Sequence, residues 1–421
     1  MAEQKKQTKS GYSMVTYQVR LYDRHFVWLE QTQKLYANVV EHFFFVLKKE
    51  QTLLELSDFL LLRALETKCI GTKEMKAKGI LPEYPLEGFP KVPLYFRRSA
   101  INTAIALARK QAETIQFLHL PITLYKGMYQ NFTDTSIELK LFNGERWVWV
   151  TYPFTGRKFP TDAKRFSPML VRKKKNTYLY VPVSFEVEDI RTVQERMQTE
   201  DRICAISFPD YDVLAVAVLL SKEGEELGQQ FFRGGKQKEF QRKRIVNHLL
   251  NSKQSRGEKE ALQTVETTRE NDAIYRKLQN LNRHYAHLIS KQILDYCLEQ
   301  NIKLIVVPKY ETGIDFREKR YLKTDAYRWI GRSIIQKLKY KAFQHGIVVT
   351  SIRPYHISDT CSFCGATIQK YNEGHTAGKN YYGGKLFKCP NGHKGNTAWN
   401  SARNIGKLFL SYYKEGNKEE E

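Results

Sequence analysis

Four residues near the end of the chain carry side chains that bind transition metals. Cys361 and Cys364 are separated by two residues, and Cys389 and His393 are separated by three. A Cys-x-x-Cys turn can direct both thiolates at one ion, and a Cys-x-x-x-His spacing lies in the known range for zinc. We therefore predict a structural Cys₃His zinc site, because four protein ligands leave no open position for catalysis. His375 is the reserve ligand, and a metal-free remnant held by hydrophobic packing is the alternative.

The elements that must position these ligands are visible in the surrounding pattern. The apolar stretch Ile302–Val307 predicts a buried strand, and Leu322–Phe343 presents Ile330, Ile334, Leu338 and Ala342 at spacings of four, as a core-facing helix does. A second strand, Ile347–Ile352, leads into the first cysteine pair. A helix that begins near Asn396 and reads N-T-A-W-N-S-A-R-N-I closes the region.

This combination of strand, helix, strand, cysteine pair and N-x-x-x-N-x-A-R-N-I helix resembles the C-terminal half of TnpB, the RNA-guided nuclease family related to type V CRISPR effectors. The resemblance implies an RNase H-like RuvC domain with an inserted zinc-binding knuckle. Three strands, at Ile203–Phe208, Val213–Leu220 and Gln229–Arg233, and a long helix at Asp272–Gln300 precede the last quarter in the order that this fold requires. Arg283-His284-Tyr285 and Tyr340-Lys341-Ala342 also match the family.

The catalytic carboxylates of that family are missing from the three matching stretches. RNase H-like nucleases hold two divalent cations between convergent carboxylates, because Mg²⁺ binds oxygen anions. The family supplies them in a G-I-D, a V-E-D-L and an N-A-D-x-N motif. At those positions this chain has Ser207, Pro308 and Ala398. We therefore expect no bound catalytic Mg²⁺ and no nuclease activity.

Four nearby acids are candidate substitutes for the lost ligands: Asp210, Asp212, Glu311 and Asp315. Moving a ligand by three residues along a strand shifts it by roughly 10 Å and can reverse the face on which it lies. No acid stands close to Ala398 in the sequence. Rescue at all three positions is therefore the less favoured interpretation.

Composition points to a nucleic-acid partner. The 421 residues include 68 Lys and Arg against 45 Asp and Glu, a formal net charge of +23, which attracts polyanions. A basic ribosome-associated or membrane-surface protein is the alternative. No apolar run is long enough to span a membrane, and the scattered cysteines Cys69, Cys204 and Cys297 fit small core residues in a reducing cytoplasm.

The first half of the chain predicts strands interrupted by helices. Met14–Tyr22 alternates apolar and polar residues, and five further strands follow between Ile122 and Val187. Helices are expected over residues 25–49, at Thr52–Glu66 and at Leu94–Ile115. These strands suggest a small barrel, and in the resembled family a barrel split in this way holds the RNA scaffold.

The fold class is thus mixed α/β and multidomain: a split β-barrel (wedge) with an inserted helical recognition lobe, then a RuvC domain with its knuckle. We expect the barrel at 1–24 and 119–200, the helical lobe at 25–118, the RuvC domain at 201–355 and 396–410, the knuckle at 356–395 and a disordered tail at 411–421.

Basic residues clustered along this arrangement are the candidates for contacts with nucleic-acid phosphates. They are Arg97, Arg98, Arg157, Lys158, Arg172, Lys173, Lys174, Lys175, Arg233, Lys236, Lys238, Arg242, Lys243, Arg244, Arg283 and His284.

The resemblance with its missing carboxylates is closest to the nuclease-dead TldR repressors. It implies a guide RNA with a scaffold, double-stranded target DNA with a short flanking motif, and transcriptional repression by occupancy of a promoter. Such a protein would lie in the bacterial cytoplasm, at the nucleoid. A nuclease with displaced ligands and a guide-independent DNA-binding protein are the alternatives, and the sequence predicts no oligomeric state.

Overall fold

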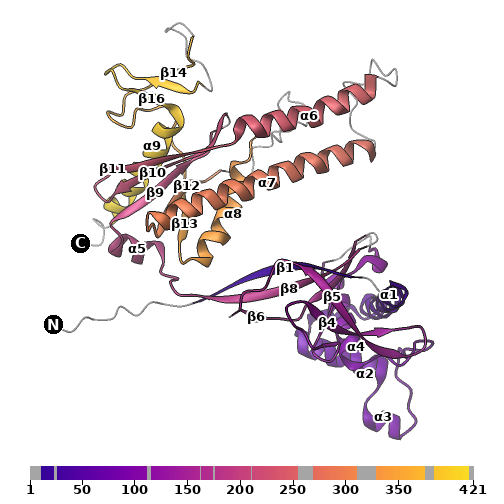
Figure 1. The fold of residues 1–421 in the computed structure, drawn as a ribbon. Helices are drawn as coiled ribbons and strands as arrows, with labels where there is room; N and C mark the ends of the chain where they lie inside the picture. The colour runs from indigo at the N-terminus through magenta and orange to yellow at the C-terminus, as the bar shows by residue number, and fades with distance from the viewer. Residues whose placement is uncertain are drawn as a thin grey trace, which may run out of the picture. The chain divides into compact units, whose positions relative to one another are not determined.

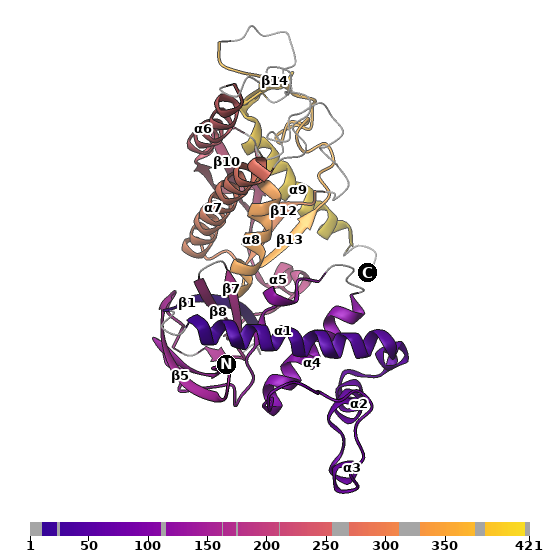
Figure 2. The ribbon, with the colours of Figure 1, turned by 90° about the vertical axis from the view of Figure 1, so that its right-hand side faces the viewer.

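The computed structural model describes residues 11–22, 26–110, 115–161, 163–173, 176–209, 211–254, 269–310, 329–374 and 384–416. Contacts divide the chain into two compact units, one of Tyr12–Glu186 and the other containing Val187–Glu421 (Figure 1 and Figure 2). Among the described residues, no helix is both long enough and apolar enough to cross a membrane.

The first unit combines helices and strands around one hydrophobic core. Its elements are β1 (Gly11–Leu21), α1 (Phe26–Lys49), the 3₁₀ helix η1 (Gln51–Glu55), α2 (Asp58–Ile70), α3 (Lys73–Ala77), α4 (Leu94–Arg109), the 3₁₀ helix η2 (Phe117–His119), β2 (Ile122–Thr123), β3 (Tyr129–Gln130), β4 (Ser136–Phe142), β5 (Trp147–Gly156), β6 (Lys164–Arg165), β7 (Met169–Lys173) and β8 (Asn176–Val187). The core joins α1 and α4 to the strands through buried residues such as Tyr36, Phe96 and Tyr152. Strands and helices of this unit therefore share one core.

The sheet of this unit is a half-barrel. Its neighbouring strands follow the order β2-β7-β8-β1-β5-β4-β3, and β6 pairs with β8. The end strands β2 and β3 are not paired with each other in the part of the chain that the structure describes. Both end strands are only two residues long, too short to close a ring of hydrogen bonds. The expected small barrel is therefore corrected to an open sheet.

Two predicted helices have different bounds. The segment expected as one helix at Thr52–Glu66 is split, because Leu56 is extended and Ser57 becomes the N-cap of α2. The helix expected to reach Ile115 ends at Arg109. Arg109 there donates to the carboxylate of Asp58, which ties the end of α4 to the start of α2.

The second unit is built on a five-stranded sheet. After α5 (Val193–Thr199) come β9 (Arg202–Ser207), β10 (Val213–Ser221), β11 (Glu226–Arg233), α6 (Gly235–Gln254), α7 (Arg269–Glu299), β12 (Leu304–Pro308), α8 (Gly331–Gln344), β13 (Val348–Ile352), β14 (Gln369–Tyr371), β15 (Leu386–Lys388), β16 (Lys394–Asn396) and α9 (Thr397–Gly416). The five strands lie in the order β11-β10-β9-β12-β13. β10 is antiparallel to both its neighbours, whereas β12 is parallel to β9 and β13. This confirms the predicted sequence of three strands, helices, a strand, a helix and a strand, although residues 322–328 of the predicted helix lie outside the described residues.

Alternate residues of the central strands serve the two faces of this sheet. Cys204 and Ile206 of β9 pack into the core that α7 and α8 cover, while Ile203 and Ala205 pack with α9 on the other face. A side-chain period of two in a strand buried on both faces produces this division. α9 lies so close to the sheet that a Cβ at Gly406 would stand 2.3 Å from Leu220. A side chain at this position would force the Leu220 side chain to shift.

A stripe of asparagines on α9 holds the backbone of the cysteine knuckle. Asn396 Oδ1 accepts from the N–H groups of Ala398 and Trp399 and so caps the helix. One turn later, Asn400 accepts from Ser362 N at 2.8 Å and donates to Thr360 O at 2.7 Å. Asn404 also donates to Thr360 O. The spacing of four in the N-x-x-x-N-x-x-x-N motif thus places all three amides on one side of the helix.

α9 also corrects the expected tail. The helix continues to Gly416, past the predicted boundary at residue 410, and only residues 417–421 lie outside the description. Leu410 is buried, and the rings of Phe409 and Tyr413 lie 5.3 Å apart. This apolar stripe on the sheet side keeps the segment helical despite its polar composition.

Replacing Asn400 by alanine should destabilise the second unit by about 2 kcal/mol, because the buried Ser362 N–H loses its acceptor. The Thr360 C=O loses one of its two donors and keeps the hydrogen bond from Asn404. Urea unfolding followed by circular dichroism measures this loss. The control is Ser401→Ala, whose hydroxyl donates only to Thr397 within the same helix and whose loss should cost roughly 0.5 kcal/mol or less. Equal losses in the two variants would contradict a role for Asn400 in holding the knuckle.

Candidate functional site

The three positions that lack the family's carboxylates converge at one end of the sheet. Ser207 Oγ donates a hydrogen bond of 2.7 Å to the backbone carbonyl of Ala398, although the two residues are far apart in sequence. Pro308 ends β12, which runs parallel to β9 with Val306 opposite Ala205. Two residues further along, this register brings Pro308 beside Ser207. The resemblance predicted this convergence, and we call the place where the three positions meet the vacated centre.

The vacated centre is lined by apolar and hydrogen-bonded groups. Ala398 packs in a cluster with Val213 and Val216, and it is 5% exposed. Trp399 packs against the same cluster, and its Nε1 donates to Glu226 at 2.9 Å. Tyr211 closes the other side through a hydrogen bond of 2.9 Å from its hydroxyl to Asn396. These contacts occupy the space around the positions where carboxylates would have to converge.

Acids near the vacated centre are engaged with cations. Asp212 accepts from Lys385 at 3.0 Å, and this hydrogen bond lowers the pKa of the Asp212 carboxyl below its usual value. Glu226 holds Trp399 and lies 3.2 Å from Arg403. In the described part of the chain, the one group of three or more His, Cys, Asp or Glu side chains placed to share an ion lies in the knuckle. The other candidate substitutes, Asp210, Glu311 and Asp315, lie outside the described residues.

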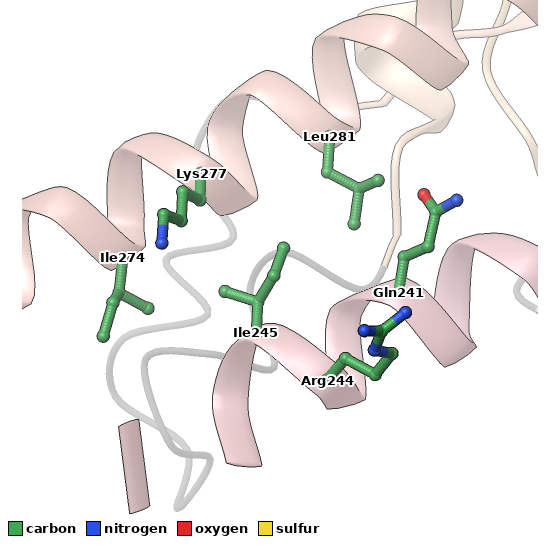
Figure 3. A pocket seen from close by; sticks show the side chains of 6 residues that line it. All are labelled: Gln241, Arg244, Ile245, Ile274, Lys277 and Leu281. Carbon is green, nitrogen blue, oxygen red and sulfur yellow. The ribbon is translucent and has the colours of Figure 1, made fainter. Parts of the chain in front are cut away.

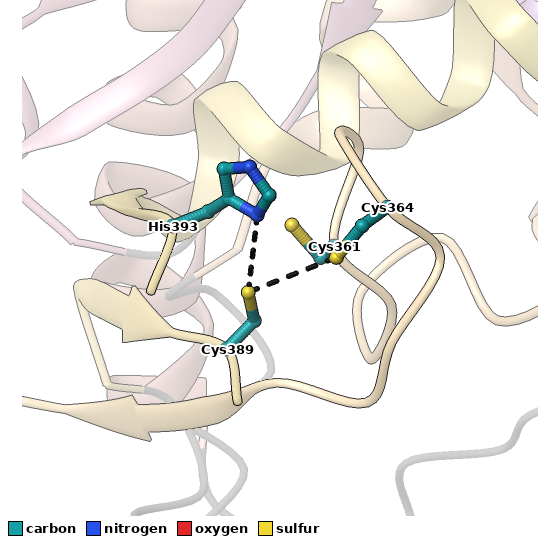
Figure 4. A group of neighbouring side chains, drawn as sticks. All are labelled: Cys361, Cys364, Cys389 and His393. Atoms are coloured by element: carbon teal, nitrogen blue, oxygen red, sulfur yellow. Dashed lines mark hydrogen bonds between the residues drawn. The ribbon is translucent and has the colours of Figure 1, made fainter. Parts of the chain in front are cut away.

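The knuckle brings its four predicted ligands together (Figure 4). The ligand atoms of Cys361, Cys364, Cys389 and His393 all lie within 4.8 Å of one another. Cys364 Sγ is 3.8 Å from Cys389 Sγ, which in turn is 3.3 Å from His393 Nδ1. Sulfurs bound to one tetrahedral ion at about 2.3 Å lie roughly 3.8 Å apart. The four side chains therefore fit one metal ion. The predicted reserve ligand, His375, lies outside the described residues.

Two tight turns point these side chains inward. Gly365 N donates to Cys361 O, and Gly392 N donates to Cys389 O, so each pair closes on a glycine. Both glycines have positive φ, +74° and +84°, a conformation that a side chain would strain. The three-stranded sheet β14-β15-β16 then carries Cys389 and His393 on its second hairpin. The short spacing within each ligand pair therefore allows a single turn to bring its two side chains together.

The cysteines differ in acidity. Hydrogen bonds from the Ala366 backbone and from Asn391 lower the pKa of the exposed Cys364 thiol to about 6. Burial instead raises the pKa of Cys361. Since the thiolate is the form that binds metal, these hydrogen bonds favour the metal-binding form of Cys364.

An aromatic stack connects the knuckle with α9, and the sequence pattern alone did not reveal it. The ring of Phe363 stacks on His393 with centroids 4.8 Å apart and an interplanar angle of 12°. The Arg403 guanidinium lies 4.2 Å from the centre of the Phe363 ring and 5.0 Å from that of Trp399. Phe363 stands between the two cysteines of the first pair, and Arg403 belongs to the A-R-N-I motif. Their pairing was not predictable because their contact is made only in three dimensions.

The basic residues predicted for the second unit fall into two groups. Arg233, Lys236, Lys243, Arg244, Arg283 and His284 are exposed. Lys238 and Arg242 are buried, at 2% and 9% exposure, and the Arg242 guanidinium is hydrogen bonded to Glu239. The prediction that Lys238 and Arg242 are exposed cations is corrected, because the face of α6 on which they lie packs inward. Ser290 and Lys341 likewise form an internal contact of 2.8 Å between α7 and α8.

In the first unit, several predicted cations are already paired. Arg97 and Arg98 both bind Glu66. Arg157 lies over Tyr17, and Arg172 lies over Phe26 and near Glu30. Lys158 and Lys173 are exposed, and Lys173 donates to the Tyr180 hydroxyl, while Lys174 and Lys175 lie outside the described residues. Arg97 and Arg98 therefore serve first to join α4 to α2.

A cleft of about 630 Å³ separates α6 from α7 (Figure 3). Gln241, Arg244 and Ile245 line it from α6, and Ile274, Lys277 and Leu281 line it from α7. None of these residues belongs to the vacated centre or to the cysteine cluster. Arg244 and Lys277 thus border a hollow that Ile245, Ile274 and Leu281 make partly apolar.

Cys389→Ser should abolish metal binding by the purified protein, because the remaining three ligands are split between two turns. His393→Cys should retain the metal, because a thiolate is an equivalent ligand. Each variant is purified by gel filtration without chelator, and its metal content is measured by elemental analysis. Cys69→Ala, a buried cysteine of the first unit, serves as the control for loss of one thiol and should leave the metal content unchanged. Metal retained by both Cys389→Ser and His393→Ala would contradict the four-ligand site.

Known proteins resemble two stretches of the chain. Residues 332–405 match the family model described as Cas12f1-like, TNB domain, and residues 13–143 match that of the Aq_aa04 family. The CRISPR-associated endodeoxyribonuclease Cas12f1 of Syntrophomonas palmitatica is 29% identical over 144 residues, which cover 34% of this chain and 25% of that protein. The TnpB-like protein aq_aa05 of Aquifex aeolicus is 27% identical over 152 residues, 35% of this chain and 47% of the relative. The matches thus span between a quarter and about half the length of these relatives.

The fold has a solved counterpart. A Cas12f1 determined by cryo-electron microscopy with sgRNA and target DNA matches 90% of this chain and 81% of its own, with a TM-score of 0.50 and 13% sequence identity. At this identity the likeness concerns the fold alone, a mixed α/β architecture with a half-barrel sheet. Residues 332–405 are thus a Cas12f1-like TNB domain, and the resemblance to TnpB and type V CRISPR effectors that the motifs indicated is confirmed.

Proposed function

We propose that this protein is a catalytically inactive, RNA-guided DNA-binding protein that represses transcription by occupying target DNA. The observation that carries the proposal is the vacated centre, where Ser207 is hydrogen bonded to the backbone of Ala398 instead of presenting a carboxylate. In this proposal the five-stranded sheet is a RuvC-like domain that retains its strand order and has lost its metal ligands. The role is that of the TldR repressors.

Charge and fold support the nucleic-acid part of the proposal. The net charge of +23 favours a polyanionic partner. A likeness of fold to a Cas12f1 solved with sgRNA and target DNA favours a guide RNA and double-stranded DNA as the partners. In such complexes base pairing reads the sequence, and the protein reads a short flanking motif and holds the heteroduplex by shape and charge. Repression then requires only that the bound complex overlap a promoter.

In the same proposal the knuckle holds zinc in a structural role. Zinc suits a closed site of three thiolates and one imidazole, whereas Mg²⁺ prefers oxygen ligands. When bound, the ion would cross-link the two turns and fix the distance between the first cysteine pair and β15. The residues that would hold it are Cys361, Cys364, Cys389 and His393. The chain itself contributes the Phe363 ring that stacks on His393 and the two turns that direct the cysteines.

The test begins with the RNA that copurifies with the protein from its own host. A discrete transcript with a folded scaffold and a short variable end is expected. The protein loaded with that RNA should bind a matched duplex and leave it intact in Mg²⁺ or Mn²⁺, as judged by mobility shift and denaturing gel. Cutting of the matched duplex, stopped by Glu311→Ala, would favour a nuclease with displaced ligands. DNA binding that survives treatment with ribonuclease would favour a guide-independent DNA-binding protein.

Ser207→Asp should destabilise the protein at neutral pH by roughly 3 kcal/mol, because a buried carboxylate would face the Ala398 carbonyl oxygen without a donor. That oxygen raises the pKa of the new carboxyl in the folded state above its value in the unfolded chain. The stability difference from wild type should therefore be small below about pH 4 and grow as pH rises through the folded pKa. Thermal unfolding of both proteins from pH 4 to pH 8 measures it.

Ser207→Asn is the matched control, because it has the same shape as the aspartate variant and no charge. Its stability loss should not change with pH. A rise in the unfolding temperature of Ser207→Asp on addition of Mg²⁺ would contradict the proposal, since it would mean that a metal site persists around this position. The triple variant Ser207→Asp, Pro308→Glu and Ala398→Asp restores all three carboxylates. Cleavage of the matched duplex by a folded triple variant would support our proposal that the vacated centre is a RuvC-like centre that has lost its metal ligands.

A further inference from the structure

Beside the vacated centre, two lysines from distant segments meet on one carboxylate oxygen. Lys385 Nζ lies 3.0 Å and Lys236 Nζ 3.5 Å from Asp212 Oδ2. Lys385 immediately precedes β15 of the knuckle, whereas Lys236 is the second residue of α6. Two ammonium groups share one carboxylate, so one positive charge is left in excess. The group therefore favours an additional anion.

All three side chains are open to solvent. The side chain of Lys236 is 78% exposed, that of Lys385 45% and that of Asp212 39%. Arg233 adds a third exposed cation close by, because it lies opposite Val213 in the pairing of β10 with β11. An ion pair this exposed is weak and readily exchanged. An incoming phosphate can thus replace the carboxylate without a large rearrangement.

The backbone brings Lys236 to this place by a close approach that only glycine allows. Gly235 N donates to Asp212 O at 3.0 Å, and a Cβ on Gly235 would stand 1.8 Å from Tyr211 O. The preceding Gly234 has a φ of +133°, which a side chain would strain. The first turn of α6 is therefore fixed against the 211–212 segment, and Lys236 with it.

The same segment connects the lysines to the vacated centre. Tyr211 lies beneath Lys385, whose Nζ is 5.5 Å from the centre of the ring. The Tyr211 hydroxyl donates to Asn396 Oδ1, which also accepts from Ala398 N. Ala398 in turn is the residue bonded to Ser207. These contacts connect Lys385 to the vacated centre through Tyr211 and Asn396.

We infer that Lys236 and Lys385 form a phosphate clamp, which binds the backbone of the target DNA beside the vacated centre and for which Asp212 is the internal counter-ion. In the free protein Asp212 holds both lysines, and in the complex a phosphodiester takes its place. The clamp joins α6 to the knuckle through the DNA backbone. This inference deepens the proposed function and rests on it for the identity of the bound strand as target DNA.

The experiment measures the affinity of the guide-loaded complex for a matched duplex over a series of salt concentrations. Lys385→Ala should weaken binding and lower the slope of log K against log salt by about 1, the loss expected for one phosphate contact. Lys385→Arg should keep the wild-type slope. Asp212→Asn should bind about two- to fivefold more tightly, because an exposed counter-ion of modest strength has been removed.

Lys388→Ala is the matched control, since Lys388 lies three residues further along the same segment, at the end of β15. The lysine of this segment that lies 3.0 Å from Asp212 is Lys385. Lys388→Ala removes the same charge, but it should reduce the affinity for DNA and the slope of log K against log salt less than Lys385→Ala does. Circular dichroism and metal content verify that each variant is folded. Identical behaviour of Lys385→Ala and Lys388→Ala would overturn the clamp.

Two further arms separate the clamp from the proposed function. A wild-type complex that shows no guided binding overturns the proposed function. If Lys385→Ala still loses about one unit of slope on an unmatched duplex with guide-free protein, the clamp is supported independently. If Lys385→Ala weakens binding of the guide RNA and leaves DNA binding unchanged, the phosphates belong to the RNA, and the clamp on target DNA is overturned.

Discussion

The second unit depends on the packing of α9 between the sheet and the knuckle. On the sheet side, Gly406 lets the helix approach so closely that a Cβ there would stand 2.3 Å from Leu220 and 3.0 Å from Ala205. Towards the knuckle, Asn400 satisfies a buried N–H and a buried C=O of the loop that carries the first cysteine pair. This helix places several of the groups that the proposed function uses. Its first two turns carry Ala398 of the vacated centre and Arg403 of the Phe363 stack, and Thr397 N donates to Lys385 O. α9 is therefore the element whose loss would separate the chemistry of the knuckle from that of the sheet.

That dependence explains why the position of Ala398 can be retained without its carboxylate. In a nuclease, an aspartate at the start of this helix would be held against other carboxylates by metal ions, which offset the repulsion between like charges. Here the same junction is held by a hydrogen bond between Ser207 and Ala398, by apolar contacts with Val213 and Val216, and by the Asn396 cap. These contacts are neutral and need no ion. In the proposed function, in which the fold serves binding, such contacts hold the junction without a metal ion.

The sequence predicted the parts of the molecule that are governed by period and spacing. The sheet strands of the second unit were found because strands buried on both faces read as apolar runs, and the ligand cluster was found because its turns are local. The half-barrel and the split of the second predicted helix were missed, since sheet closure depends on pairing between distant strands and η1 ends at a single extended residue. Lys238 and Arg242 were assigned to the surface by charge alone. Their burial depends on which face of α6 packs inward, and a helix with so many cations does not reveal this in its sequence.

The same reasoning shows why electrostatics around the vacated centre could not be derived from residue types. Asp212 looks in the sequence like a displaced metal ligand, because it follows β9 and is acidic. In the structure two ammonium groups occupy its carboxylate, and the pKa of Asp212 is lowered by Lys385 as it would be by a bound cation. A carboxylate whose charge is already neutralised has little attraction left for Mg²⁺, whereas the excess cation beside it attracts phosphate. In the proposed function, the preference of this place for phosphate over a metal ion thus follows from which residues face Asp212, and not from Asp212 itself.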